Sequence, residues 1–323
     1  MTPTKRHANM CNMSKISNCL IKQINNIVYL CRPFLRPLIR RILIHPAIIV
    51  YVDGGTCSQL EDYVIIKVLE ENGITVLADC SWYDSCDSLP DSVTARPFNL
   101  DKLFHLQPYK KATKFQLWLY KLLFVYHPTD QDKKENGISV YLGSFSLPSP
   151  PCYLAGYYYF TDEEMHHYIP KYSRLKNPED ILDDINLRQY HEITSVENTI
   201  GVHVRRGDMS AEGGYWKIVP PEYFINICKI PELQDYTFYF FSEEPEWIKE
   251  NIAPYINVKY QIVDNNPSYY GYKDLYLLSC CKYQASSQGS FGLYAYMLNS
   301  HQDKKLISYN ETQKDLWEWN KLS

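Results

Sequence analysis

The chain has 323 residues, and 45% of them are hydrophobic, as in a globular protein with a sizeable core. Residues 1–50 hold eight Lys and Arg and no Asp or Glu, so residues 51–323 have 25 basic and 37 acidic residues. This acidic body excludes nucleic acid as a partner. The ten cysteines form no Cys-x-x-Cys pair, which favours reduced thiols in a cytosol over a disulfide scaffold.

Residues 1–45 are predicted to form a basic amphipathic extension. Arg32, Arg36, Arg40 and Arg41 lie on one side of an apolar stretch between residues 24 and 44. No apolar run is long enough to span a bilayer, and no secretory cleavage site follows. We expect peripheral contact with an anionic membrane, with a disordered or partner-packed extension as the alternative.

A strand, a glycine turn and a helix are predicted next. Residues 46–52 are apolar, Gly54 and Gly55 follow, and a helix extends to about residue 72. This order is typical of the first unit of a Rossmann-like sheet. Residues 73–79 predict a second strand, and residues 110–126 predict an amphipathic helix.

The second half alternates strands with helices. Residues 173–198 are charged and mostly helical, and residues 220–224 begin another helix. Apolar strands at 236–241 and 258–263 end in polar turns, and residues 272–282 form a helix. A further helix runs from residue 289 to 299, a last strand covers 305–309, and residues 316–322 predict a closing helix. The pattern favours a parallel sheet.

Between these halves lies the stretch Thr199–Ser210. Ile200, Val202 and Val204 alternate as in a strand, which then runs into Arg205, Arg206, Gly207 and Asp208. Open α/β sheets bind ligands at the carboxyl ends of their strands, and forked guanidinium groups suit a diphosphate. The alternatives are a salt-bridged surface loop or, from Arg206-Gly207-Asp208, an adhesion motif.

The stretch His203-Val-Arg-Arg-Gly-Asp208 resembles the first signature of the α-1,2-fucosyltransferases of glycosyltransferase family 11. Further stretches follow the order of that family between residues 47 and 310. Among them are Asp79-Cys-Ser-Trp-Tyr83, Ser242-Glu-Glu-Pro-Glu-Trp247 and the helix that contains Asp274-Leu-Tyr-Leu-Leu-Ser279.

The resemblance implies an α/β fold of the GT-B type, in which two Rossmann-like domains face a cleft. Residues 46–190 would form the acceptor-side domain, and residues 191–323 would form the GDP-sugar-binding domain with its closing helix. It also implies an inverting transfer of L-fucose from GDP-β-L-fucose to a galactoside hydroxyl, giving an α-1,2 linkage in surface polysaccharide synthesis. We expect neither a metal nor a cofactor, because Asp130-Gln-Asp132, the one metal-like Asp-x-Asp, lies in a polar loop and not after a hydrophobic strand.

The resemblance also assigns candidate site residues. Arg205 would stabilise the departing diphosphate, Arg206 would brace the loop or share the phosphate, and Asp208 or Glu212 would act as the base. Glu243, Asp264 and Asp274 are the acidic candidates for guanine or ribose. The other residues expected to contact GDP-fucose are Gly54, Gly55, Gln59, His203, Ser242, Ser290 and Phe291.

The chain departs from the family where Thr56, Cys57 and Ser58 replace Leu, Gly and Asn, and around Gln288 and Gly289. These changes leave open another GDP-sugar, another linkage, or a non-catalytic glycan-binding descendant. The basic amino-terminal segment favours a lipid-linked glycan acceptor, with the protein in the cytoplasm at the inner face of a bacterial inner membrane.

Overall fold

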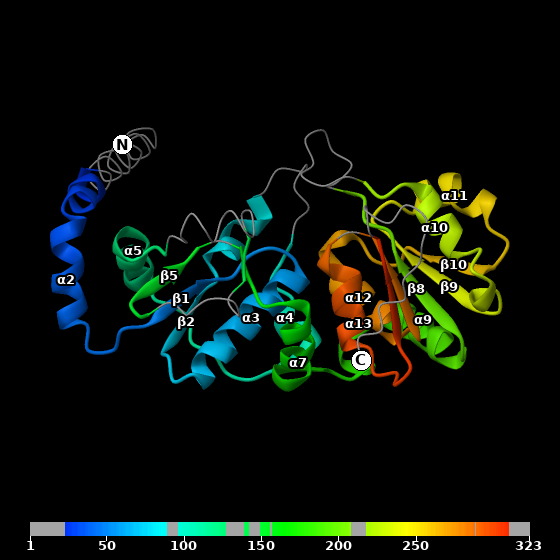
Figure 1. Cartoon of the computed structure of the whole chain (residues 1–323), viewed down its shortest axis with the longest axis horizontal. Coiled ribbons are helices and arrows are strands. Elements are labelled where there is room, and N and C mark those ends of the chain that lie inside the picture. Colours follow the sequence, from blue (N-terminus) through cyan, green and yellow to red (C-terminus); the bar gives the residue numbers. More distant parts are fainter. Residues whose placement is uncertain are drawn as a thin grey trace, which may run out of the picture. The chain divides into compact units, whose positions relative to one another are not determined.

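The computed structural model describes residues 23–88, 96–126, 139–141, 149–155, 157–207, 218–287 and 289–309 (Figure 1). The chain divides into two compact units that interleave along the sequence. The first comprises Met1–Val52, Ile65–Cys80 and Tyr109–Thr161, and the second comprises Asp53–Val64, Ser81–Pro108 and Asp162–Ser323. The predicted domain limits, 1–45, 46–190 and 191–323, stay a prediction.

The first unit contains a three-stranded parallel sheet in the order β2-β1-β5. The strands are β1 (Ile48–Tyr51), β2 (Val76–Asp79) and β5 (Cys152–Leu154), so the strands predicted at 46–52 and 73–79 are confirmed. Helix α5 (Lys114–Leu123) begins with a Thr113–Gln116 capping box, as its sequence favours. The core of the first unit consists of Ala47, Ile49, Leu77, Tyr120, Leu123, Phe124 and Tyr153.

The second unit contains a five-stranded parallel sheet in the order β10-β9-β8-β11-β12. Its strands are β8 (Thr199–His203), β9 (Thr237–Phe241), β10 (Lys259–Val263), β11 (Tyr283–Ser286) and β12 (Lys305–Ser308). From β8 the chain adds two strands on one side and then crosses to the other side for β11. Such a reversal marks the point where open α/β sheets bind ligands, here between the ends of β8 and β11.

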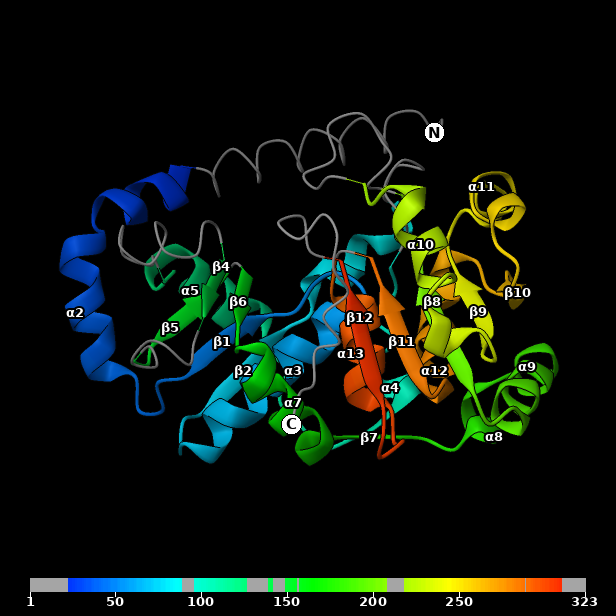
Figure 2. The same cartoon turned by 45° about the vertical axis from the view of Figure 1, so that its right-hand side comes forward.

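Helices cover both faces of this sheet (Figure 2). On one face, Ile200 and Val202 pack with Phe224 of α10 (Pro221–Ile227) and Ile248 of α11 (Pro245–Asn251). On the other face lie α12 (Gly271–Cys280), which contacts α9 (Asp184–Ser195), and α13 (Ser290–Leu298). Both β8 and β9 are buried along their whole length, as inner strands of a parallel sheet covered on both faces are.

The remaining described elements are short or lie outside the two main sheets. They are α2 (Arg32–Ile42), α3 (Thr56–Glu71), η1 (Ser81–Ser88), α4 (Leu100–Leu103), β3 (Phe104–Leu106), β4 (Ser139–Tyr141), β6 (Tyr157–Tyr159), α7 (Asp162–Tyr172), β7 (Ser173–Leu175), α8 (Pro178–Ile181), η4 (Pro231–Leu233), η5 (Ala253–Tyr255) and η6 (Ser268–Tyr270). Strands β3 and β7 pair antiparallel, which corrects the mostly helical expectation for residues 173–175. The closing helix predicted at 316–322 lies outside the described residues.

No helix within the described residues is both long enough and apolar enough to cross a bilayer. The amphipathic α2 carries Pro33 and Pro37 and still forms eleven residues of helix.

Gly201 provides a test of the packing between β8 and α12. A Cβ added there would overlap Leu278 Cδ1 and lie 3.1 Å from Cys281 Sγ. We expect Gly201→Ala to lower the free energy of unfolding by about 1–3 kcal/mol, because the buried α12 has no room to retreat. Gly271→Ala is the control, since nothing lies within 4 Å of the added Cβ. Urea midpoints that are equal for the two variants would contradict this packing.

Candidate functional site

A pocket of about 240 Å³ lies in the second unit, at the carboxyl ends of its parallel strands. His203 and Arg205 reach it from the end of β8, and Phe241 and Ser242 from the end of β9. The first turns of α12 and α13 and the turn at residues 55–58 complete the lining. The pocket therefore coincides with the switch point that the strand order defines.

Eight residues predicted from the sequence line this pocket: Gly55, His203, Arg205, Ser242, Glu243, Asp274, Ser290 and Phe291. Four others are not in its lining: Gly54, Gln59, Arg206 and Asp264. Asp208 and Glu212 lie outside the described residues. The chemical roles proposed for all of these residues stay predictions.

Gln59 has a structural position behind the glycine turn. It is fully buried, and its side-chain nitrogen donates to the carbonyl oxygens of Gly54 (3.1 Å) and Pro97 (3.0 Å). Its side-chain oxygen accepts from the backbone N–H of Asn99 at 2.9 Å. Gly54 itself has φ +72°, a conformation that favours glycine. Gln59 thus holds the turn against residues 97–99, and Gly55, Pro97 and Asn99 line the pocket.

The two arginines after β8 separate, as adjacent residues of an extended segment do. Arg205 lines the pocket and forms an ion pair with Glu243 (Nη1 to Oε1, 3.0 Å). Arg206 pairs with Glu244 (Nε to Oε2, 2.8 Å), and its guanidinium lies 4.0 Å from the ring centroid of Trp247. Glu244 also accepts the N–H of Gly207 at 2.9 Å. Arg206 is therefore held against Glu244 and Trp247, and of the two arginines it is Arg205 that lines the pocket.

His203 is only 7% exposed and stacks on Phe291 of α13, with ring centroids 4.6 Å apart. Burial, aided by the charge of Arg205, lowers the pKa of His203 to about 3, so the imidazole is neutral at physiological pH. Its Nδ1 is buried and has no hydrogen-bond partner among the described residues. A buried polar atom of this kind is satisfied when a ligand or water binds beside it.

The amino terminus of α13 forms another part of the pocket wall. Gly289 precedes the helix with φ +99°, and no side chain caps the first turn. Ser290 lines the pocket and forms a hydrogen bond with the thiol of Cys57, whose pKa burial raises to about 12. The thiol is therefore neutral, and the uncapped amides with the serine hydroxyl make a wall suited to an anion.

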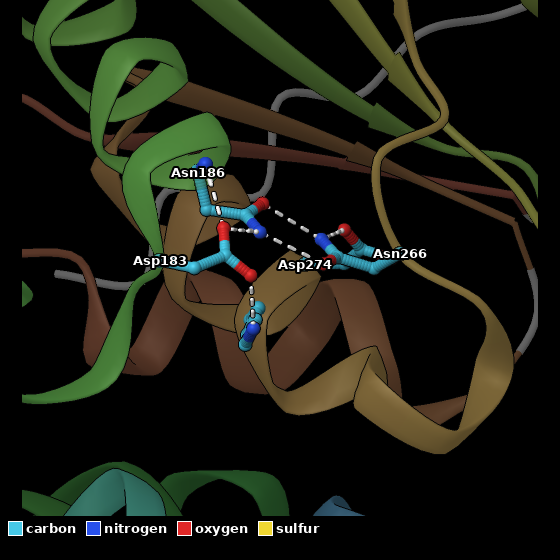
Figure 3. Close-up of polar contacts among 5 residues, drawn as sticks. Asp183, Asn186, Asn266 and Asp274 are labelled. Carbon is cyan, nitrogen blue, oxygen red and sulfur yellow. Dashed lines mark hydrogen bonds and ion pairs between the residues drawn. The ribbon is translucent and has the colours of Figure 1, made fainter.

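Behind Asp274 lies a hydrogen-bonded chain of side chains (Figure 3). Asn266 donates to Asp274 Oδ1 at 2.6 Å, and Asn266 and Asn186 exchange two amide hydrogen bonds of 2.9 Å. Asn186 donates to Asp183 at 2.8 Å, and Lys273 closes the chain on Asp183 at 2.6 Å. The N-cap of α9, the loop after β10 and the first turn of α12 are thereby fixed to one another.

Burial raises the pKa of Asp274 to about 7, and the negative charge of Glu243 adds to the shift. The hydrogen bond from Asn266 and the charge of Lys273 oppose it without cancelling it. The hydrogen bond from Lys273 lowers the pKa of Asp183 to about 2. Their surroundings thus give Asp274 and Asp183, the two carboxyl groups of this hydrogen-bonded chain of side chains, widely different pKa values.

Several lining residues had no role assigned from the sequence, among them Arg96, Asn99, Asn266 and Ser268. Arg96 and Asn99 belong to Arg96-Pro-Phe-Asn-Leu-Asp-Lys-Leu-Phe104, a further stretch whose sequence resembles the family, and that resemblance was the available signal. Among the described residues, no group of three or more His, Cys, Asp or Glu side chains is placed to hold a metal ion. Asp130 and Asp132 lie outside those residues.

Comparisons with known proteins identify the family of the chain. The model of the family "Glycosyl transferase family 11" matches residues 126–321, and the chain belongs to this family. The family predicted from the sequence is therefore confirmed. The O-antigen biosynthesis glycosyltransferase WbnK of Escherichia coli is 26% identical over 116 residues, which are 34% of this chain and 38% of that protein.

Among solved structures, the α-1,6-fucosyltransferase NodZ soaked with GDP-fucose is similar with a TM-score of 0.51 and 14% identity. The match covers 85% of this chain and 98% of NodZ. A mutant of Arabidopsis thaliana FUT1 in complex with GDP has a TM-score of 0.49 and 12% identity, over 83% of this chain and 71% of that one. The likeness to NodZ confirms the predicted α/β fold of the GT-B type.

The raised pKa of Asp274 predicts a pH-dependent stability. The folded state binds this proton more tightly than the unfolded state, so its stabilising contribution is present at low pH and is lost as the pH rises from about 4 to about 7. Asp274→Asn removes the titration. We expect the free energy of unfolding of the variant, relative to the natural protein, to rise over this range and level off above it. A difference that stays constant in denaturation curves across these pH values contradicts the burial of Asp274.

Proposed function

We propose that the chain transfers L-fucose from GDP-β-L-fucose to a glycan hydroxyl. The observation that carries the proposal is the convergence of Arg205, His203 and Ser290 on one pocket at the switch point of a chain of glycosyl transferase family 11. NodZ, which has a similar fold, is described as an α-1,6-fucosyltransferase soaked with GDP-fucose. That likeness supports the fold, and the donor is inferred from the pocket and the family.

Arg205 is the proposed ligand of the diphosphate. Its guanidinium has five donors, so it keeps its hydrogen bond to Glu243 while the remaining N–H groups bind phosphate oxygens. The amides at the start of α13 and the Ser290 hydroxyl bind from another part of the pocket wall. These groups stabilise the negative charge that develops as GDP leaves, so the reaction needs neither a metal nor a cofactor.

Asp274 is the proposed acceptor for the guanine base. A carboxylate offers about four lone-pair positions, and Asn266 occupies one of them. Guanine N1–H and N2–H₂ are donors that a second carboxylate oxygen can bind. Glu243 also lines the pocket and remains the alternative acceptor for guanine or ribose.

The acceptor hydroxyl attacks the anomeric carbon from the face opposite to GDP, which inverts β-fucoside to α-fucoside. The C1–O bond to GDP breaks as the new C1–O bond forms, and the hydroxyl proton passes to Asp208 or Glu212. We propose an α-1,2 linkage to a galactoside of a lipid-linked surface polysaccharide, made in the cytoplasm at the inner membrane. The name of WbnK, an O-antigen biosynthesis glycosyltransferase, accords with such an acceptor.

Another GDP-sugar or another linkage is the second candidate. Thr56, Cys57 and Ser58 all line the pocket, at positions where the sequence departs from the family pattern. Cys57 additionally contacts Ser290. A different donor sugar would meet these side chains while the same GDP contacts remain.

Arg205→Ala tests the diphosphate assignment. We expect loss of fucosyl transfer by roughly 100- to 1,000-fold, because a preorganised cation at a developing charge contributes about that factor. Calorimetric titration with GDP, GDP-fucose and GDP-mannose, in the presence of EDTA, measures the accompanying loss of binding.

Arg188→Ala is the matched control, because Arg188 is an exposed arginine of α9 in the same unit. Near-normal turnover by Arg205→Ala contradicts the assignment of Arg205 to the diphosphate. Tighter binding of GDP-mannose than of GDP-fucose moves the donor to the second candidate. Binding of no nucleotide identifies a non-catalytic descendant.

Asp274→Asn tests separately whether Asp274 binds the guanine base. An amide presents one acceptor where the carboxylate presents two, so the variant loses a hydrogen bond to the guanine 2-amino group. We expect the ratio of GDP to IDP affinity to fall by roughly 10- to 150-fold, the usual range for a hydrogen bond to a charged group. An unchanged ratio in competition titrations means that a group other than Asp274 binds guanine.

A further inference from the structure

Helix α2 presents three parallel rows of side chains, each spaced by four residues. The first row packs partly buried on the core of the first unit and consists of Leu35, Ile39 and Leu43. The second row is apolar and exposed, at 82%, 56% and 63%, and consists of Phe34, Leu38 and Ile42. The third row is basic and consists of Arg32, Arg36 and Arg40. The helix therefore has a wider apolar face than its own unit covers.

The exposed apolar row continues beyond α2. Ile27 and Leu30, in the helical residues 23–30, are also largely exposed. Helix α5 contacts α2 in the same unit (Figure 1). It exposes Phe115 and Trp118, whose ring centroids are 5.9 Å apart. Trp118 Nε1 donates to Asn25 Oδ1 at 3.0 Å, which links α5 to the helical residues 23–30. A run of large apolar groups of this extent marks an interaction surface.

The basic row has no carboxylate partner among the described residues. Arg32 Nε is buried without a hydrogen-bond partner, and Arg36 Nε donates to the carbonyl oxygen of Leu123. Arg36 and Arg40 line a groove of about 370 Å³ whose described lining residues include no acidic side chain. Three guanidinium groups thus lie on successive turns of α2 without a carboxylate partner in the described part of the chain, as in an anion site.

We propose that this α2–α5 face docks on the surface of an anionic phospholipid bilayer. The apolar row enters the boundary of the acyl chains, Trp118 lies at the level of the headgroups, and the arginine row binds lipid phosphate. The inference gives a structural basis to the peripheral localisation proposed above, and it rests on contacts within the first unit alone.

Charge distinguishes the bilayer from other occupants of this face. Residues 1–50 contain no Asp or Glu, so the preceding segment of the chain cannot neutralise the arginine row. A second copy would bring the same basic row against it and would be repelled. Anionic lipid supplies many phosphates beside an apolar layer, which matches both rows at once.

The test measures sedimentation of the full chain with vesicles of phosphatidylcholine, with and without phosphatidylglycerol. We expect binding only to the anionic vesicles. Phe34→Glu combined with Leu38→Glu should abolish it, and Arg40→Gln should weaken it by roughly 5-fold, because each basic side chain near the surface contributes about that factor. All three side chains are exposed, so the fold should persist.

Ile185→Glu and Arg188→Gln are the matched controls, since both residues are exposed on α9 of the second unit. They should bind vesicles as the natural protein does. Thermal unfolding and GDP titration of every variant separate loss of docking from misfolding and from failure of the proposed transferase activity. Absence of vesicle binding, binding that ignores lipid charge, or unchanged binding of the Phe34–Leu38 variant overturns the proposal.

Discussion

The central position of β8 is the constraint on which the site depends. Its end is joined to both neighbouring strands: the N–H of Val204 donates to Phe241, and the N–H of Ser287 donates to His203. The N–H of Arg205 then donates to Ser287 Oγ at 2.8 Å. The backbone that carries Arg205 is therefore fixed by hydrogen bonds on both sides before any ligand arrives. Because the backbone at Arg205 is already ordered, the binding of a phosphate by its guanidinium costs little further backbone entropy.

Charge is balanced at this edge by two consecutive arginines against two consecutive glutamates. Arg205 pairs with Glu243 and Arg206 with Glu244, so the loops after β8 and β9 hold each other. The two pairs have different surroundings, because Arg206 lies over the ring of Trp247, whereas Arg205 lines the pocket. The Arg206–Glu244 pair is thus suited to supporting the loop, and the Arg205–Glu243 pair is suited to exchanging contacts with a ligand. This division explains why a single sequence signature contains two adjacent arginines with unlike environments.

Much of this arrangement was predictable, because apolar runs that end in polar turns identify β8, β9 and β10 and place their ends at one edge. Strand β11, which lies next to β8, was missed. Only Cys281 and Lys282 separate it from α12, and the apolar sequence runs through both elements without a turn signal. Asn266 and Asn186 were missed for another reason. Their role comes from an amide pair across 80 residues of sequence, and isolated asparagines carry no periodic pattern.

The wall formed by residues 56–58 shows how a departure from the family pattern changes the site without changing the fold. Gln59, which keeps the family identity, fixes the turn by three hydrogen bonds, so substitutions beside it leave the backbone in place. Cys57 then brings a buried neutral thiol to Ser290 at the amino terminus of α13. Cys57 stands where the family has glycine, so its thiol adds a side chain beside Ser290, at the wall proposed to bind the donor's diphosphate. The stretch His203–Asp208 keeps the family signature, so this change does not involve the arginine side of the pocket.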